Sequence, residues 1–228
     1  MKLCVALDND TLEENLNLVQ ELKEFNNIWL KVGFRTYIRD GSEFINQLKI
    51  INPNFKIFLD LKLYDIPNTM ADAASEIAKL DIDMFNVHAS AGKKAMSEVM
   101  KRLSIIKNRP IVIAVTALTS FTNEDFNDIY NDTIDNKATF FAKDAFKSGM
   151  DGVVCSAFES KNIKINTNNS FITLSPGIRP FGEDAGDQKR IVDLTIAKKE
   201  LVDFVVVGRP IYKSKNPKKI VEKILEYL

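Results

Sequence analysis

The stretch KIFLDLK at residues 56–62 decides how the rest of the chain is interpreted. It is short and almost continuously apolar, which is typical of a parallel strand covered on both faces. Alternate residues of a strand share a face, so we expect Asp60 and Lys62 to point one way and Ile57 and Leu59 the other. The stretch therefore predicts a buried strand that ends in two charged side chains.

Seven more stretches have the same apolar character, and helix-period segments separate them. The predicted strands are residues 2–8, 28–33, 56–62, 84–89, 110–118, 152–157, 171–177 and 203–208. The predicted helices are residues 11–25, 42–51, 68–80, 93–107, 138–148, 188–200 and 217–227, with a short segment at 158–161 and a loop at 166–169. A regular alternation of strand and helix predicts a parallel sheet covered by helices.

The number of units favours a closed barrel. Eight units in 228 residues average about 28 residues each, which suits a repeated strand–helix unit. The count favours a (β/α)8 TIM barrel over an open doubly wound sheet. The sequence also lacks the GxGxxG turn that a dinucleotide-binding open sheet would carry after its first strand. No linker interrupts the pattern, so we expect one barrel domain over residues 1–228.

The composition excludes several classes of protein. Lysines and arginines number 31, as do aspartates and glutamates, which argues against nucleic-acid binding through bulk positive charge. The apolar runs are far shorter than the ~20 residues of a membrane-spanning helix, and no signal peptide precedes the first strand. We therefore expect a cytoplasmic protein without a membrane partner. Cys4 and Cys155 are expected to be buried free thiols. His88 is the single histidine, which excludes two-histidine mechanisms and His-rich zinc sites.

Polar side chains close most of the predicted strands, where the functional groups of a (β/α)8 barrel gather. The candidates are Asp8, Lys31, Asp60, Lys62, Asp65, His88, Thr116, Thr119, Arg179 and Arg209. Clustered lysines and aspartates are costly to desolvate and mark functional sites more often than structural ones. A partly buried ion pair is the alternative for Asp60 and Lys62. An ammonium between carboxylates stays charged, so Lys62 fits a proton donor rather than a Schiff-base amine.

Three of these candidates have ordinary structural roles as alternatives. His88 is expected to lie in the core or behind the site. Thr116 and Thr119 suit ligand hydrogen bonds and helix or turn caps equally well.

Two glycine-containing loops follow the last two predicted strands. They read SPGIR at residues 175–179 and VGRPI at residues 207–211. Phosphate groups often bind at these positions of a (β/α)8 barrel, on backbone amides. Gly177 and Gly208 allow close backbone approach, and Arg179 and Arg209 offer bidentate contacts to phosphate oxygens. The loops predict a phosphate site with residues 180–188 as a closing lid, and ordinary surface loops are the alternative.

Residues 58–69 (FLDLKLYDIPNT) look like the signature of a known family. The chain resembles the orotidine 5′-phosphate decarboxylases of the short bacterial type. Supporting matches lie at residues 6–8 (ALD), 31–33 (KVG), 86–89 (NVHA), 114–119 (AVTALT), 151–156 (DGVVCS), 176–179 (PGIR), 187–188 (DQ) and 206–209 (VVGR). The resemblance implies a lyase that converts orotidine 5′-phosphate (OMP) to UMP and CO2 in de novo pyrimidine biosynthesis, with no cofactor and no metal.

The resemblance also implies the catalytic residues. Lys62 is the implied proton donor to C6 of the pyrimidine, and Asp60 would lie beside the departing carboxylate. Asp65, Ile66 and Thr69 would reach into the site of a second subunit, so that a homodimer shares its active sites.

The implied substrate-binding residues follow from the same resemblance. Asp8 and Lys31 would bind the ribose hydroxyls, and Lys31 would also belong to the catalytic chain of charges. The implied residues near the pyrimidine are Thr119 and Ser120, and those around the phosphate are Pro176, Arg179, Gln188, Gly208 and Arg209.

Three other classes fit parts of this pattern. Metal-dependent sugar-phosphate decarboxylases such as 3-keto-gulonate-6-phosphate decarboxylase share an Asp-x-Lys-x-x-Asp motif. They need an acidic metal ligand near the end of the second strand, where this chain has Lys31. A non-catalytic phosphoribosyl-binding barrel would need the phosphate loops without Asp60, Lys62 and Asp65. A structural ion-pair network would not explain the two arginine loops.

Overall fold

The strands form a closed barrel. The computed structural model describes residues 1–182 and 190–228. The strands are β1 (Lys2–Ala6), β2 (Trp29–Gly33), β3 (Lys56–Leu63), β4 (Met84–His88), β5 (Ile111–Val115), β6 (Gly152–Val154), β7 (Ile172–Ser175) and β8 (Phe204–Val207). They are hydrogen-bonded in chain order, every neighbouring pair is parallel, and β8 closes on β1. The predicted (β/α)8 barrel is confirmed.

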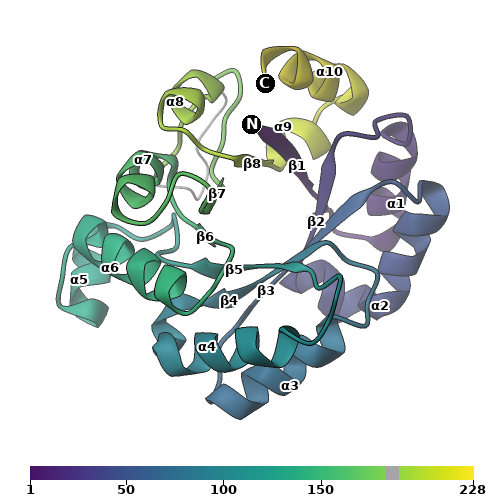
Figure 1. Ribbon diagram of the computed structural model, residues 1–228. Helices are drawn as coiled ribbons and strands as arrows, with labels where there is room; N and C mark the ends of the chain where they lie inside the picture. The colour runs from purple at the N-terminus through teal and green to yellow at the C-terminus, as the bar shows by residue number, and fades with distance from the viewer. Residues whose placement is uncertain (183–189) are drawn as a thin grey trace.

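Helices surround the strands, as Figure 1 shows. They are α1 (Leu12–Glu21), α2 (Phe34–Ile51), α3 (Pro67–Ile77), α4 (Gly92–Leu103), α5 (Asn123–Tyr130), α6 (Ile134–Lys147), α7 (Ala157–Asn166), α8 (Leu194–Lys199), α9 (Arg209–Tyr212) and α10 (Pro217–Tyr227), with a 3₁₀ turn η1 (Ala89–Ala91). Local signals set several of their starts. Thr11 and Glu14 form a capping box at α1, and Pro67 occupies the first turn of α3.

Some predicted helix bounds were wrong. The segment predicted as short at 158–161 is the ten-residue helix α7. Its buried residues include Glu159, Ser160 and Lys164, so no apolar stripe marks it in the sequence. Residues 190–193 are not helical, because Val192 forms a β-bridge with Ile178 before Asp193 caps α8. The helix α5 and the first half of α2, which continues through a kink at Gly41, were not predicted.

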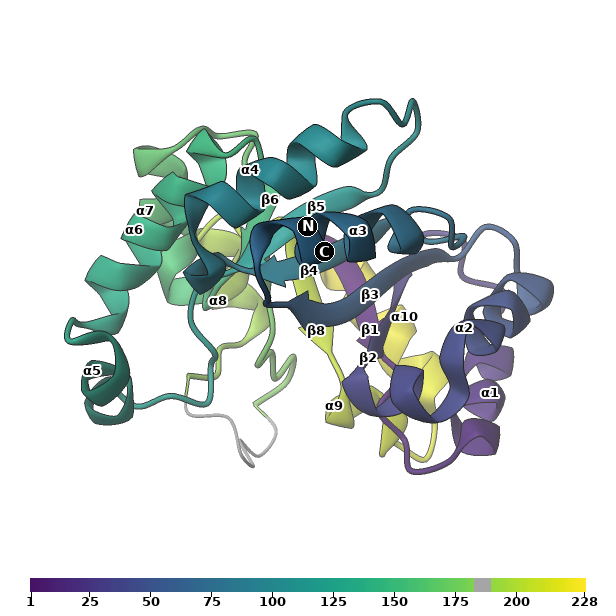
Figure 2. The ribbon, with the colours of Figure 1, turned by 90° about the horizontal axis from the view of Figure 1, so that it is seen from below.

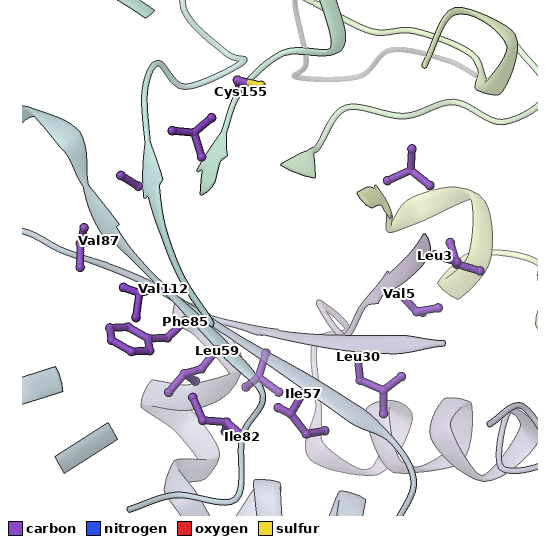
Figure 3. Close-up of a cluster of buried hydrophobic side chains, with 14 of the residues drawn as sticks. Leu3, Val5, Leu30, Ile57, Leu59, Ile82, Phe85, Val87, Val112 and Cys155 are labelled. Atoms are coloured by element: carbon purple, nitrogen blue, oxygen red, sulfur yellow. The ribbon is translucent and has the colours of Figure 1, made fainter. Parts of the chain in front are cut away.

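The barrel wall separates two apolar layers. The outer layer lies between strands and helices and includes Ile57, Leu59 and Phe85, which Figure 3 shows on the helix side of the strands. Cys155 belongs to this layer, whereas Cys4 lies in the inner one, and both are buried free thiols as predicted.

The inner layer fills the barrel and forms a floor beneath its carboxyl end. It comprises Cys4, Ala6, Trp29, Phe58, Met84, Ile113, Val115, Val154, Leu174, Phe204 and Val206. Because side chains alternate along a strand, the next inward positions are Lys31 on β2, Asp60 on β3 and Asn86 on β4, with Asp8 two residues beyond the end of β1. Apolar residues thus give way to polar ones at one level of the barrel.

The carboxyl ends of the strands lie on one side of the molecule. In Figure 2, α5 and α9, which follow β5 and β8, both lie at the lower edge of the view. Within residues 1–182 and 190–228, no helix combines the length and the apolar character that a membrane span requires.

Candidate active site

A cavity of about 460 Å³ opens above the apolar floor. This volume is within the range of about 300–1,000 Å³ that is usual for small-molecule sites. Its lining includes the predicted residues Asp8, Lys31, Asp60, Lys62, Thr119, Ser120, Pro176, Gly208 and Arg209. The barrel therefore brings together side chains from both ends of the chain in one pocket.

The charged wall of this cavity consists of Asp8, which follows β1, Lys31 on β2, and Asp60 and Lys62 on β3. Lys31 Nζ lies 3.2 Å from Asp8 Oδ1 and 3.6 Å from Asp60 Oδ2. On the other side of the same carboxylate, Lys62 Nζ donates a hydrogen bond to Asp60 Oδ1 at 2.6 Å. The order Asp8–Lys31–Asp60–Lys62 alternates in sign, so every charge has an opposite neighbour.

Burial and charge act in opposite directions on this wall. Burial alone would lower the pKa of Lys31, but the carboxylates of Asp60 and Asp8 outweigh it and raise that pKa above its usual value. Burial alone would raise the pKa of Asp60, but Lys31 and Lys62 outweigh it and lower that pKa. Both groups are thus held in their charged forms at neutral pH.

Gly33 makes room for the Lys31–Asp8 pair. A Cβ atom at Gly33 would lie 3.0 Å from Lys31 Nζ and 3.3 Å from Asp8 Oδ1. A side chain there would push against the two charged groups. The absence of a side chain at Gly33, the last residue of β2, therefore lets Lys31 and Asp8 pair in the charged wall.

Lys62 lies in an irregular part of β3. The pairing of β3 with β4 runs from Leu59↔Phe85 to Leu63↔Val87, so four residue steps of β3 face two of β4. Within this bulge Lys62 has φ 46°, the left-handed region that lysine rarely adopts. Such conformations cost on the order of 1–3 kcal/mol and cluster at functional sites.

Asn86 is a site residue to which the sequence analysis gave no role. It is buried on β4, with 1% of its surface exposed. Its Oδ1 accepts a hydrogen bond from the Lys62 backbone N–H at 2.7 Å, and its Nδ2 donates to Asp60 Oδ1 at 2.7 Å. The signal in the sequence is an amide at an inward position, among the apolar residues Met84, Phe85 and Val87.

A second part of the cavity lining, the glycine wall, consists of Pro176, Gly177, Gly208 and Arg209, from the loops after β7 and β8. Gly177 has φ 76°, which glycine adopts without strain. Gly208 precedes α9, and Arg209 is the first residue of that helix. Here the chain presents backbone and a guanidinium to the cavity.

Some predicted site residues do not line the cavity of this chain. Asp65, Ile66 and Thr69 are exposed on the β3–α3 segment, where Asp65 Oδ1 accepts a hydrogen bond from the Ile66 N–H at 2.7 Å. Arg179 is buried, and its Nη1 donates to the carbonyl oxygen of Ile178. Gln188 and most of the predicted lid at 180–188 lie outside the described residues.

His88 and Thr116 have structural positions. His88 stacks on Tyr64 and caps η1 by accepting a hydrogen bond from the Ser90 N–H. Burial, with a smaller contribution from Lys62, lowers the pKa of His88. Thr116 is fully buried and donates to the carbonyl oxygen of Val154 on β6. Neither residue lines the cavity.

Comparison with known proteins agrees with this geometry. The profile of the "Orotidine 5'-phosphate decarboxylase / HUMPS family" matches residues 1–224. The chain is 64% identical over its full length to the orotidine 5′-phosphate decarboxylase of a Nitratiruptor species, with 100% of both chains covered. It is 66% identical to that of Nautilia profundicola, with 99% of this chain and 97% of the relative covered.

A solved structure shows the same fold. The orotidine 5′-phosphate decarboxylase of Lactobacillus acidophilus superposes with a TM-score of 0.86 at 31% identity, covering 99% of this chain and 98% of that one. The barrel, the sequence relatives and the matching profile lead to one conclusion: the chain belongs to the orotidine 5′-phosphate decarboxylase / HUMPS family.

Proposed function

We propose that the chain is a carbon–carbon lyase that converts OMP to UMP and CO2 in de novo pyrimidine biosynthesis, without a cofactor. The observation that carries this proposal is the Lys62 ammonium, 2.6 Å from Asp60 in a cavity that Arg209 also lines. A proton donor on β3 and a cationic group after β8, both lining one cavity, suit a nucleotide whose reacting carbon is remote from its phosphate. The names of the relatives support the same substrate.

The chemistry needs a cation and a proton at the same place. The bond between C6 and the carboxylate breaks, CO2 leaves, and the electron pair stays on C6. The Lys62 ammonium stabilises that developing charge and then donates a proton to C6, which completes UMP. Lys62 regains its proton from solvent, so the balance is OMP plus one proton to UMP plus CO2.

Asp60 has two roles in this scheme. It holds the Lys62 ammonium by a direct hydrogen bond, and Lys31 supports its charge from the other side. Beside the substrate carboxylate, its negative charge would repel that group, and the repulsion is relieved when CO2 leaves. The alternating Asp-Lys network thus serves both position and electrostatics.

The remaining lining residues bind the rest of the nucleotide. We assign the ribose hydroxyls to Asp8 and Lys31 and the pyrimidine to Thr119 and Ser120, all of which line the cavity.

We assign phosphate binding to the glycine wall, through Pro176, the Gly208 amide and the Arg209 guanidinium. Gln188 and Arg179 complete the proposed phosphate contacts, Arg179 as an anchor of its loop. Phosphate binding remote from C6 would contribute energy that is used in the transition state.

We also propose a homodimer with shared active sites. Tyr64 and Ile66 are 64% and 66% exposed directly after β3, beside the mouth of the barrel, where a partner chain would cover them. Asp65, Ile66 and Thr69 would complete the site of the partner chain. Mixing inactive Lys62→Ala and Asp65→Ala chains should restore part of the activity through one intact site per mixed dimer. Absence of any recovery would count against sharing.

The metal-dependent alternative is weaker on physical grounds. Lys31 Nζ lies between Asp8 and Asp60, at 3.2 and 3.6 Å. A divalent cation at those carboxylates would face this ammonium at close range, which is strongly repulsive. A cytoplasmic location stays a prediction from the sequence.

The decisive experiment is an absorbance assay of OMP consumption with EDTA present. The chain should be produced in a pyrimidine-requiring host that lacks its own OMP decarboxylase. Identically prepared Lys62→Ala protein is the control for contaminating activity. Turnover that EDTA leaves unchanged supports the proposal. Turnover that EDTA abolishes and magnesium restores would favour the metal-dependent class, and no consumption of OMP would refute the function.

A further inference from the structure

We propose that Asn86 is a positioning residue that holds Lys62 and Asp60 as one unit, and this inference rests on the proposed function. Both the oxygen and the nitrogen of its side-chain amide form hydrogen bonds to residues of the charged wall. Oδ1 accepts from the Lys62 N–H and Nδ2 donates to Asp60 Oδ1, each at 2.7 Å. One buried amide thus contacts the backbone of the proton donor and the carboxylate that binds the donor's ammonium.

The need for Asn86 follows from the bulge in β3. A regular parallel strand would satisfy the Lys62 amide through backbone pairing with its neighbour. The register shift between Leu59 and Leu63 removes that pairing, and the Asn86 side chain supplies the acceptor instead. A buried amide without an acceptor is rare in proteins because its desolvation goes uncompensated.

The same bond supports the backbone conformation of Lys62. At φ 46° Lys62 is in the left-handed region, which is unfavourable for lysine, so the surrounding structure must hold the backbone there. Relaxation of this φ would swing the side chain away from its present direction. We infer that Asn86 keeps the Lys62 ammonium aimed into the cavity, although Asn86 itself does not line it.

Three variants separate positioning from general stability. Asn86→Ala removes both hydrogen bonds. Asn86→Asp keeps the acceptor for Lys62 but replaces the donor to Asp60 with a second carboxylate. Asn52→Ala is the matched control, because Asn52 is also a buried amide with two hydrogen-bond acceptors as partners, Lys23 O and Asn26 Oδ1, away from the cavity.

Asn86→Ala should lower kcat about 100-fold, the loss that a misplacement of about 1 Å can cause, while KM changes little. UMP binding, measured by calorimetry, should stay within about threefold of the wild type, since the proposed ribose and phosphate contacts remain. Asn52→Ala should lower the melting temperature comparably but leave kcat unchanged. A kcat of Asn86→Ala within about threefold of the wild type would overturn the proposal.

Asn86→Asp adds a second measurement, the pH dependence of kcat, which would not change if Asn86 served stability alone. The introduced carboxyl would face Asp60 and Lys62 on β3, with Lys31 beyond Asp60, His88 on its own strand, and only apolar Ile113 and Val115 on β5. Deprotonated, it repels Asp60; protonated, it can donate as the asparagine does. The ratio of its kcat to that of the wild type should therefore rise as pH falls, and a ratio independent of pH would contradict the inference. The wild type, measured in parallel, removes the contribution of His88.

A measurement without turnover keeps this test apart from the proposed function. Hydrogen exchange of the Lys62 amide should be at least about tenfold faster in Asn86→Ala, relative to amides of β5, because its acceptor is gone. Unchanged exchange would refute the positioning role whatever the substrate. If the wild type does not consume OMP but Asn86→Ala still shows the faster exchange of the Lys62 amide, only the proposed function is refuted.

Discussion

The two walls of the cavity are built in different ways. The charged wall consists of side chains that contact one another: Lys31 pairs with Asp8 and Asp60, and Lys62 with Asp60. The glycine wall presents Gly177 and Gly208 backbone and the first residue of a short helix, Arg209. We infer that the first wall is preorganised for the reacting atoms, whereas the second binds a remote group. The following experiments test this division of labour.

The largest effect is expected at the reacting end of the charged wall. Lys62→Ala removes both the cation and the proposed proton donor, so kcat should fall by about 10⁴-fold or more. UMP should still bind, as calorimetry can measure. Lys56→Ala is the matched control, since Lys56 is an exposed lysine at the other end of β3. A near-normal kcat in Lys62→Ala would end the assignment.

A smaller and different effect is expected on the glycine wall. Arg209→Ala should weaken UMP binding by about 10- to 100-fold, the value of one or two charge-assisted hydrogen bonds, and leave uridine binding unchanged. Lys215→Ala removes an equal charge from an exposed position nearby and serves as control. Equal losses for UMP and uridine would show that Arg209 does not read the phosphate.

The pH dependence of stability tests the charged wall without substrate. Asp60 has a lowered pKa, so its contribution to stability is present above the ordinary carboxyl pKa of about 4 and is lost as pH falls through the lower folded value. The free energy of unfolding of the wild type minus that of Asp60→Asn should therefore be constant near neutrality. Below pH ~4 it should shrink by on the order of 1 kcal/mol per pH unit. Urea titrations at a series of pH values measure this, and a difference that stays flat down to pH ~3 would contradict it.

The smallest effect is expected from crowding of the Lys31–Asp8 pair. Gly33→Ala places a Cβ atom 3.0 Å from Lys31 Nζ, so the ammonium must shift by a few tenths of an ångström. We expect KM for OMP to rise a few-fold, with a smaller change in kcat. Steady-state kinetics measure this split. A change confined to kcat would mean that the pair serves the chemical step and not ribose binding.

The strands could be predicted because buried parallel strands are continuous apolar runs, and all eight are present. The charged wall was predictable for a related reason: charged residues directly after such runs must meet at the barrel mouth. Helix α7 was not, since Glu159 and Lys164 lie on its buried side. The bulge at Lys62 was not predictable either, because strand periodicity assumes regular pairing and the partner, Asn86, is distant in sequence. The catalytic and binding roles of all the site residues stay predictions, and for Asp65, Ile66, Thr69 and Gln188 so does their place in a site.

The apolar floor of the barrel has an electrical consequence. Residues such as Phe58, Met84 and Phe204 exclude water beneath the charged wall, so they form a medium of low dielectric constant. Screening is therefore weak on the inner side, and the field of Lys31, Asp60 and Lys62 is focused toward the open mouth. A substrate that fills the mouth displaces the remaining water and experiences that field almost unscreened. The apolar packing that stabilises the barrel thereby also reduces the screening of the charges in its site.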